Sequence, residues 1–457
     1  MYILNRIQSI KRDKVFLHKT LSITIPIALQ GLINTSINFV DTLMIGKLGE
    51  TTIAAVGLAN KVFFVFSLLV FGVCSGSGVL ASQYWGKREV PNIKKVLGFT
   101  ILLSFLASLV FLIPSLLNPN MVMRIFTNSE ETIKVGAIYL SIVVFSYPFT
   151  AITNSYVAIL RGVNEVKAPV VISTVSIFIN VFFNYILIYG KFGAPVMGVA
   201  GAAIATLIAR VVETTVLLVL VYKKNGPVSA RISEMLQAFN KSFIVKYVTT
   251  VLPVIINEFM WGLGVTMYAL AYGRMGDAAM AAITITQTTE QLLQVVSMSL
   301  CNAAAVILGN ELGAGHLKDA DEHAKNFFFL QLVFSIIMGA LCFISRDFVI
   351  SLFVVSNEVA ELIRLCFLSF ILYLPFKMFN AMNVVGVLRS GGDTKACLFL
   401  DCSGVWLIGI PMAFIGGLYL KLPIYLVYAM VLVEEIYKFI FGIRRYLKKV
   451  WLRNIVA

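Results

Sequence analysis

The second half of this chain repeats the first half at an offset of 227 positions. At that offset, Gly46–Glu50 (GKLGE) aligns with Gly273–Asp277 (GRMGD). At an offset of 228, Leu160–Ala168 aligns with Leu388–Ala396. Matched glycines and charges in loops are hard to obtain by chance from an apolar composition. A repeat of this kind is typical of membrane proteins built from two lobes, with the transport path between them.

The composition predicts an all-α integral membrane protein. Of 457 residues, 59% are hydrophobic and 13% are charged, whereas a soluble domain carries about 25% charged residues. Apolar runs of about 20 residues recur along the whole chain. We expect twelve transmembrane helices in two pseudo-symmetric six-helix bundles, at roughly 20–44, 53–83, 94–117, 134–160, 168–190, 197–222, 246–272, 280–309, 324–344, 359–388, 396–417 and 422–443.

The positive charge of the chain predicts its topology. The net charge is +14, and if both termini lie in the cytoplasm the inside segments hold 26 lysines and arginines while the outside loops hold 8. Such a bias favours this orientation and contact with anionic lipid, not binding to nucleic acid. Because each half has an even number of helices, the two repeats run parallel and are related by an axis along the membrane normal.

The repeat and the loops predict five regions. A cytoplasmic segment, 1–19, precedes an N-lobe at 20–222, and a cytoplasmic linker at 223–245 leads to a C-lobe at 246–443 and a basic cytoplasmic tail at 444–457. The linker contains an amphipathic stretch from Ile232 to Phe239 that is suited to the membrane surface.

The motifs of enzymes are missing from the sequence. Its three histidines lie near predicted cytoplasmic loops, and neither HExxH nor GxxxxGK[ST] occurs. The six cysteines lack metal-ligand or disulfide spacing. We therefore expect no enzymatic activity and no cofactor, with transport energy drawn from a gradient of H⁺ or Na⁺.

Charged residues inside the bilayer are costly and mark function by default. Asp41 lies inside the first predicted helix, where a carboxylate can take a proton from one side and release it to the other as its hydration changes. Asn180 and Asn184 are four residues apart and so share one helix face. With Asp41 they would form a network that holds a proton or an oxygen site for Na⁺. The alternatives are a helix-end aspartate and asparagines that join helices.

The second half offers further polar residues inside predicted helices. Glu258 is the intramembrane carboxylate nearest to the start of the second repeat, and it would bind the coupling cation or form an interhelical hydrogen bond. Glu290 forms a polar stripe with Gln287 and Gln294, which we expect to line a water-filled cavity.

Two lysines are further candidates for a substrate cavity. Lys377 lies deep in its helix, with Asn380 and Asn383 one and two turns later. It would pair with Glu258 or Glu290, or meet an anionic group of a substrate. Lys61 lies nearer to the middle of its helix than a snorkelling residue prefers.

Two other features are given structural roles. Arg210 and Glu213 are three residues apart and are expected to pair with each other. Gly72, Gly76 and Gly78 would allow either close packing or bending of the second helix.

Four short motifs carry a family resemblance: Val40–Gly46 (VDTLMIG), Ser82–Lys87 (SQYWGK), Leu160–Gly162 (LRG) and Leu388–Thr394 (LRSGGDT). In order and spacing they resemble the multidrug and toxic compound extrusion (MATE) transporters over nearly the whole chain. The resemblance implies two six-helix bundles arranged as a V that alternate between outward-open and inward-open states. It also implies export of amphipathic, often cationic organic compounds in exchange for H⁺ or Na⁺.

The resemblance also implies roles for individual residues. Asp41 matches the family's cation-binding aspartate of helix 1, Asn180 matches the asparagine beside it, and Glu258 looks like the helix-7 glutamate of the NorM-like branch. Two positions depart from the pattern: Asn184 stands where some members carry a carboxylate, and the helix-10 aspartate is replaced by the region around Lys377. The first lobe is therefore the predicted cation site.

The rival functions are a lipid-linked oligosaccharide flippase of the same superfamily and a membrane scaffold without transport. A flippase favours extra helices and a strongly basic cavity, whereas a scaffold needs no carboxylate in helix 1. We expect a monomer in the bacterial cytoplasmic (inner) membrane, with drugs and toxic organic compounds as small-molecule partners.

Overall fold

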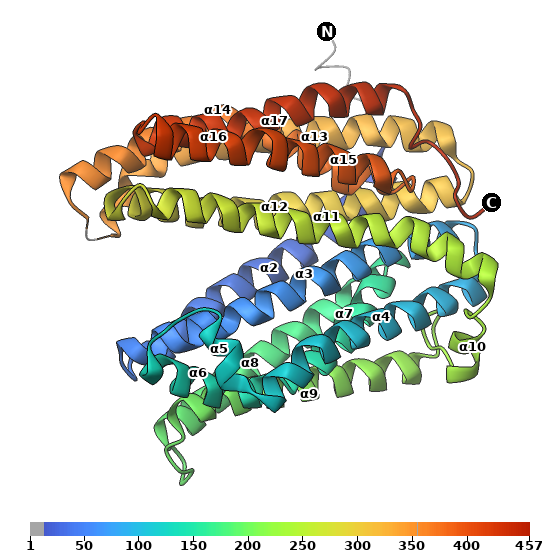
Figure 1. The fold of residues 1–457 in the computed structure, drawn as a ribbon. Coiled ribbons are helices and arrows are strands. Elements are labelled where there is room, and N and C mark those ends of the chain that lie inside the picture. Colours follow the sequence, from blue (N-terminus) through green and yellow to red (C-terminus); the bar gives the residue numbers. More distant parts are fainter. Residues whose placement is uncertain (1–12, 354) are drawn as a thin grey trace. The chain divides into compact units, whose positions relative to one another are not determined.

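The computed structural model describes residues 13–353 and 355–457, and all regular structure in this part is helical (Figure 1). The chain divides into two compact units. The N-terminal unit is Pro26–Ile255, and the C-terminal unit is Ile256–Ala457 together with the start of the chain up to Ile25. Most of the predicted cytoplasmic segment at 1–19 lies outside the described residues.

The N-terminal unit contains the first half of the repeat. Its helices are most of α2 (Lys14–Gly46), then α3 (Glu50–Gly86), α4 (Val90–Leu117), α5 (Pro119–Arg124), α6 (Glu130–Val143), α7 (Ser146–Gly162), α8 (Lys167–Tyr189), α9 (Gly198–Lys224), α10 (Ile232–Leu236) and the beginning of α11 (Lys241–Gly273).

The C-terminal unit contains the second half. Its helices are the rest of α11, α12 (Asp277–Gly313), α13 (Leu317–Ser351), α14 (Asn357–Ala381), η1 (Met382–Leu388), α15 (Thr394–Gly404), η2 (Val405–Gly409), α16 (Ile410–Phe414), η3 (Ile415–Tyr419) and α17 (Ile424–Leu447). The three η segments are π-helical turns. Within this unit α14 and α17 lie side by side (Figure 1).

The described helices confirm the predicted all-α membrane fold. Ten helices are long and apolar enough to cross a membrane, and α6 with α7, bent by 49°, forms one more span. The predicted twelfth helix corresponds to α17, which is 24 residues long but falls outside this set and carries Glu434, Glu435 and Lys438 near its middle. The limits of the two units fall inside α2 and α11, so the lobes 20–222 and 246–443 stay a prediction.

The backbone repeats as closely as the sequence does. α2 and α11 are both 33 residues long and contain the aligned Pro26 and Pro253. The following helices, α3 and α12, are both 37 residues long. Each is preceded by a glycine with positive φ, 112° at Gly49 and 109° at Gly276. L-residues rarely adopt this conformation, which explains why both turns contain glycine at this position.

The second aligned motif also folds alike in both halves. Asn164 has φ 65° and its counterpart Gly392 has φ 70°. In the first half the Glu165 amide donates to the Leu160 carbonyl at 2.8 Å, and in the second half the Asp393 amide donates to the Leu388 carbonyl at 3.0 Å. The offset of 228 therefore relates equivalent backbone positions in this region.

Close packing explains two of the three glycines that lie between residues 72 and 78 of α3. A Cβ at residue 72 would lie 2.7 Å from the Ile255 Cα, and a Cβ at residue 76 would lie 2.9 Å from the Val251 Cα. A Cβ at Gly78 would meet nothing within 4 Å. Gly72 and Gly76 thus let α3 approach the backbone of α11, as small residues do between membrane helices.

We expect Gly72→Ala to lower the thermal stability of the purified protein, by about 1–3 kcal/mol, because the added methyl group overlaps main-chain atoms that cannot turn away. The matched change Gly78→Ala adds the same methyl group to open space in the same helix. It should leave stability equal or slightly higher. Thermal unfolding in detergent measures both, and equal losses in the two variants would contradict close packing at Gly72.

The predicted linker contains one short helix that lies on α4. The Lys94 ammonium bonds Glu234 of α10 at 2.7 Å, and this hydrogen bond lowers the pKa of Glu234. The Phe99 and Phe239 rings lie 5.3 Å apart. Ile232 and Leu236 remain exposed, as expected for a helix that contacts the membrane surface.

The predicted C-terminal tail is partly packed into its unit. Trp451 is fully buried. The Arg453 guanidinium donates to the Gly391 and Gly392 carbonyls, both at 3.1 Å, and the Asn454 amide donates to the Gly313 carbonyl at 3.0 Å. These bonds join the tail to the turn between η1 and α15 and to the end of α12.

Candidate functional site

The N-terminal unit encloses a cavity of about 590 Å³ between its helices. It has both apolar and polar walls, with side chains from α2, α3, α6, α7, α8 and α9. The polar lining residues include Asn34, Asp41, Asn60, Tyr139, Tyr147, Asn180, Asn184, Thr206 and Arg210. A cavity of this size, with a few polar groups that converge on it, is typical of a small-molecule site.

Asp41 lies in this cavity beside both predicted asparagines. The Asn184 amide donates to Asp41 Oδ1 at 2.8 Å and to Asn180 Oδ1 at 3.2 Å. One turn further along α8, the Tyr189 hydroxyl donates to the Met44 carbonyl at 2.8 Å. The structure thus brings together the three residues that the sequence singled out, and it fixes α8 against the end of α2.

Asn180 can present either end of its amide to Asp41. With the oxygen toward Asp41, its nitrogen donates to Thr206 Oγ1 at 3.3 Å. With the nitrogen toward Asp41, it donates to Asp41 Oδ2 at 2.9 Å. In the first orientation, Asn180 Oδ1 and Asp41 Oδ2 are both acceptors 2.9 Å apart. A proton or another cation must then lie between them. The first orientation therefore suits a protonated or cation-bound Asp41, and the second suits an ionised one.

A positive charge faces the same cavity. Arg210 pairs with Glu213 at 2.7 Å, as predicted. Glu213 is only 3% exposed and also accepts a hydrogen bond from Ser173 at 2.7 Å. Because Glu213 is buried behind it, Arg210 is held in place with part of its guanidinium open to the cavity.

Two buried polar atoms in the cavity wall have no partner in the described part of the chain. They are the Tyr147 hydroxyl and Asn184 Oδ1. Buried polar atoms are nearly always hydrogen-bonded. A ligand, water or cation in the cavity would satisfy both of them.

Glu258 forms a different kind of contact in the C-terminal unit. Its carboxylate pairs with Arg389 at 2.7 Å, and Arg389 is only 2% exposed. The first half contains a similar neutral contact, in which Arg161, aligned with Arg389 at an offset of 228, donates to Gln30 at 3.2 Å. Gln30 lies one residue before the position that aligns with Glu258 at the offset of 227 shared by α2 and α11. Glu258 therefore corresponds to the residue that bonds an arginine in the first half. It does not correspond to Asp41.

Lys377 pairs with Glu290, one of the two partners that the sequence offered. Glu290 also accepts hydrogen bonds from Gln294 at 2.7 Å and from the Tyr428 hydroxyl at 2.9 Å. The predicted polar stripe of α12 thus takes part in a network that joins α12, α14 and α17.

The same network extends along α17 through charged residues that were not among the predicted site residues. Lys438 is 6% exposed and lies 3.3 Å from Glu434 and 3.5 Å from Glu435. The Asn380 amide donates to Glu435 at 2.8 Å. The i,i+4 spacing of Glu434 and Lys438 in an apolar helix was the available signal.

The remaining candidates have no assigned partner in this network. Gln287 is half-buried and Lys61 is exposed on α3, and Lys61 is not among the residues that line the cavity of the N-terminal unit. Asn383 is 1% exposed, and neither atom of its amide has a partner among the described residues. Their part in substrate binding stays a prediction.

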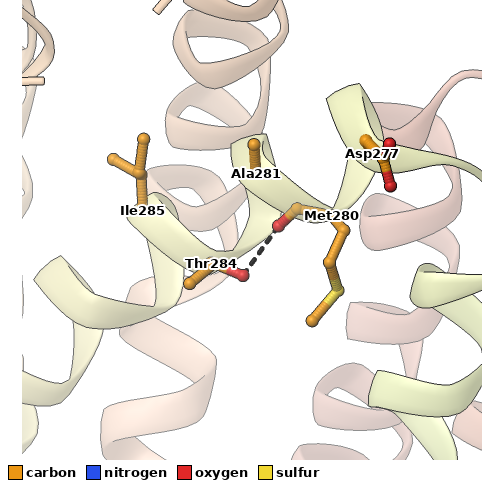
Figure 2. A pocket seen from close by; sticks show the side chains of 5 residues that line it. All are labelled: Asp277, Met280, Ala281, Thr284 and Ile285. Atoms are coloured by element: carbon orange, nitrogen blue, oxygen red, sulfur yellow. Dashed lines mark hydrogen bonds between the residues drawn. The ribbon is translucent and has the colours of Figure 1, made fainter. Parts of the chain in front are cut away.

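A second hollow, of about 300 Å³, lies against one face of α12. Figure 2 shows its five lining side chains, among them Asp277 and Met280. The Thr284 hydroxyl already donates to the Met280 carbonyl at 2.7 Å. All five lining residues belong to α12, so polar groups from different helices do not converge on this hollow.

The chain is similar to known membrane transporters over nearly its full length. The MatE family model matches residues 26–186 and 253–415. The probable multidrug resistance protein YoeA of Bacillus subtilis is 25% identical over 418 residues, 91% of this chain and 90% of that protein. The probable multidrug resistance protein NorM of Thermotoga maritima is 24% identical over 412 residues, 88% of this chain and 86% of that protein.

Solved structures share the fold. A multidrug resistance MATE family transporter in its outward-facing conformation has a TM-score of 0.83 and is 20% identical, covering 94% of this chain and 96% of that one. A MATE structure in the straight conformation has a TM-score of 0.84 and is 18% identical, covering 94% and 95%.

Proposed function

The chain belongs to the MatE family, and we propose that it is a secondary active efflux transporter. It exports amphipathic, often cationic organic compounds in exchange for H⁺ or Na⁺, by alternating access. As a multi-pass membrane protein it has ten described helices that are long and apolar enough to span a bilayer and one further span in the bent pair of α6 and α7, and α17 would be the twelfth. We place it in the bacterial cytoplasmic membrane as a monomer, with both termini in the cytoplasm, as the distribution of lysines and arginines favours.

The observation that carries this proposal is the position of Asp41. It is a carboxylate in the wall of a cavity, held by Asn184 at 2.8 Å and within reach of Asn180. A carboxylate inside the bilayer is expensive and is expected to serve ion or substrate movement. Relatives named as multidrug resistance proteins support drugs as the substrate class.

The two orientations of Asn180 suggest how a cation acts. When Asp41 is ionised, the Asn180 nitrogen turns toward it. When a cation binds, the Asn180 oxygen turns toward Asp41 and its nitrogen bonds Thr206 of α9. Cation binding would thus change the contacts among α2, α8 and α9 around the cavity. For exchange to occur, drug and cation must favour different states or compete for one.

The ion gradient limits what this exchange can achieve. One charge moved through about 100 mV supplies about 2.3 kcal/mol, which corresponds to roughly fifty-fold accumulation of substrate. A second coupled cation would raise this limit.

Efflux of a cationic dye from loaded cells tests the proposal. The proton gradient and the Na⁺ gradient are collapsed separately with ionophores, and cells without the protein provide the background. We expect one of the two treatments to stop efflux, which also identifies the coupling ion. Efflux that continues with both gradients collapsed, or no efflux above background for any amphipathic cation, would overturn the proposal.

A further inference from the structure

We propose that the C-terminal unit contains a proton-binding site of its own, formed by Glu434 with Tyr268 and Lys438. The site lies within one unit and uses none of the residues around Asp41. It goes beyond the proposed function, because it adds an exchangeable proton, besides the cation at Asp41, that the efflux proposal does not require.

The first observation is an imbalance of buried charge. Three buried carboxylates, Glu290, Glu434 and Glu435, face two lysines, Lys377 and Lys438. Glu290 is paired with Lys377, so Glu434 and Glu435 share Lys438 between them. A net negative charge inside a membrane protein is costly. One bound proton removes it.

The second observation is the internal repeat. Four lining residues of the N-terminal cavity, Asp41, Phe63, Thr206 and Arg210, align with Tyr268, Glu290, Glu434 and Lys438 at the offsets of 227 and 228. The second half thus has a polar site at the equivalent place, with its carboxylate on α17 in place of α2.

The third observation is that two glycines leave room for the side chains around Glu434. A Cβ at Gly404 would lie 2.6 Å from Lys438 Cε, and a Cβ at Gly409 would overlap the Tyr268 hydroxyl and the Glu434 carboxylate. Gly409 ends η2, a π-helical segment, and such segments often occur at functional sites. The glycines leave the space that the two charged side chains occupy.

The hydrogen-bond partners identify which carboxylate takes the proton. Glu434 Oε2 lies 2.6 Å from the Tyr268 hydroxyl, whereas Glu435 faces the Asn380 amide at 2.8 Å. An amide N–H can only donate, but a tyrosine hydroxyl can also accept. Glu434 can therefore carry a proton on Oε2 and donate it to Tyr268, while Oε1 still accepts from Lys438. The carboxylate changes from charge −1 to 0, and the proton comes from water.

A buried polar atom points into the same cluster. Asn380 is 4% exposed, its nitrogen bonds Glu435, and its Oδ1 has no partner among the described residues. This acceptor is available to a proton-bearing group or a water that carries the proton in. The titratable and charged groups that face Glu434 or its partner Lys438 from the surrounding helices are Tyr268 and Tyr272 of α11, Lys377 of α14, half-buried Asp401 of α15, and Glu435 and Lys438 of α17. Glu290 of α12 pairs with Lys377.

Infrared difference spectroscopy of the purified protein during a pH change tests this site. Protonated carboxyl groups give a C=O stretching band that ionised groups lack. In the wild-type protein we expect this band to contain one contribution from Asp41 and one from Glu434. Asp41→Asn should remove the Asp41 contribution. Glu434→Gln should remove the Glu434 contribution and leave that of Asp41. Glu434→Gln leaves two carboxylates and two lysines, so it should fold normally.

Two further variants sharpen the result. Tyr268→Phe should shift the frequency of the Glu434 band without removing it, because the proton loses its acceptor. Lys438→Met leaves both Glu434 and Glu435 without a lysine and should increase the band. Glu165→Gln, which alters an exposed carboxylate paired with Lys224 at 2.7 Å, is the control and should change neither contribution.

The outcomes separate this site from the proposed function. A band unchanged by Glu434→Gln, or one that Na⁺ abolishes at constant pH, would overturn the proton site even if efflux depends on Asp41. Loss of the Glu434 contribution with no gradient-dependent efflux in cells would support the site and contradict the efflux proposal.

Discussion

Asp41→Asn is expected to reduce gradient-driven dye efflux to the level of cells without the protein. The substitution keeps the size of the side chain and its contact with Asn184. It removes the negative charge that attracts the coupling cation, so the two states of the site can no longer be distinguished. The whole of the roughly fifty-fold accumulation that one charge can drive should therefore be lost. Dye efflux at equal expression measures the effect.

The matched control is Asp277→Asn, the same chemical change at an exposed position of α12. It should leave efflux at the wild-type rate. The thermal stability of the Asp41→Asn protein should also be close to that of wild type, because an asparagine can bond Asn180 and Asn184. Efflux at the wild-type rate in Asp41→Asn would show that Asp41 is not needed for transport. A large loss of thermal stability would show that Asp41 has a structural role.

The sequence predicted the fold because the fold depends on signals that are local. Apolar length marks the helices, and glycine at 49 and 276 marks turns that need positive φ. The repeat of these signals then predicts two related halves. The family comparisons confirm the resemblance that the motifs carried. The Asp41 network was also predictable, because a carboxylate and two asparagines stand out inside apolar helices.

The sequence could not predict which charged residues become buried at helix ends. Arg389 follows a predicted helix and resembles a cytoplasmic charge, yet it is 2% exposed. Lys438 lies inside the predicted helix 422–443, and it is 6% exposed. Their burial depends on partners far along the chain, such as Glu258, and on glycines such as Gly404 that leave room. The hydropathy of a segment does not reveal such contacts between residues far apart in the sequence.

Arg389→Met is expected to cause the largest loss of stability among these variants. It leaves Glu258 buried without its partner at 2.7 Å. Removal of one member of a buried ion pair costs about 3–5 kcal/mol. The double variant Glu258→Gln with Arg389→Met leaves no uncompensated charge and should recover most of that loss. Thermal unfolding in detergent measures both, and dye efflux shows whether the double variant still transports.

The repeat supplies the control. Arg161→Met breaks the equivalent contact in the N-terminal unit, but it leaves the neutral Gln30, at a cost of only about 1–3 kcal/mol. If Glu258 serves as the partner of Arg389, the double variant keeps its efflux. If Glu258 binds the coupling cation, the double variant is stable and does not transport. Equal losses in Arg161→Met and Arg389→Met would show that burial of the arginine matters more than its charge pairing.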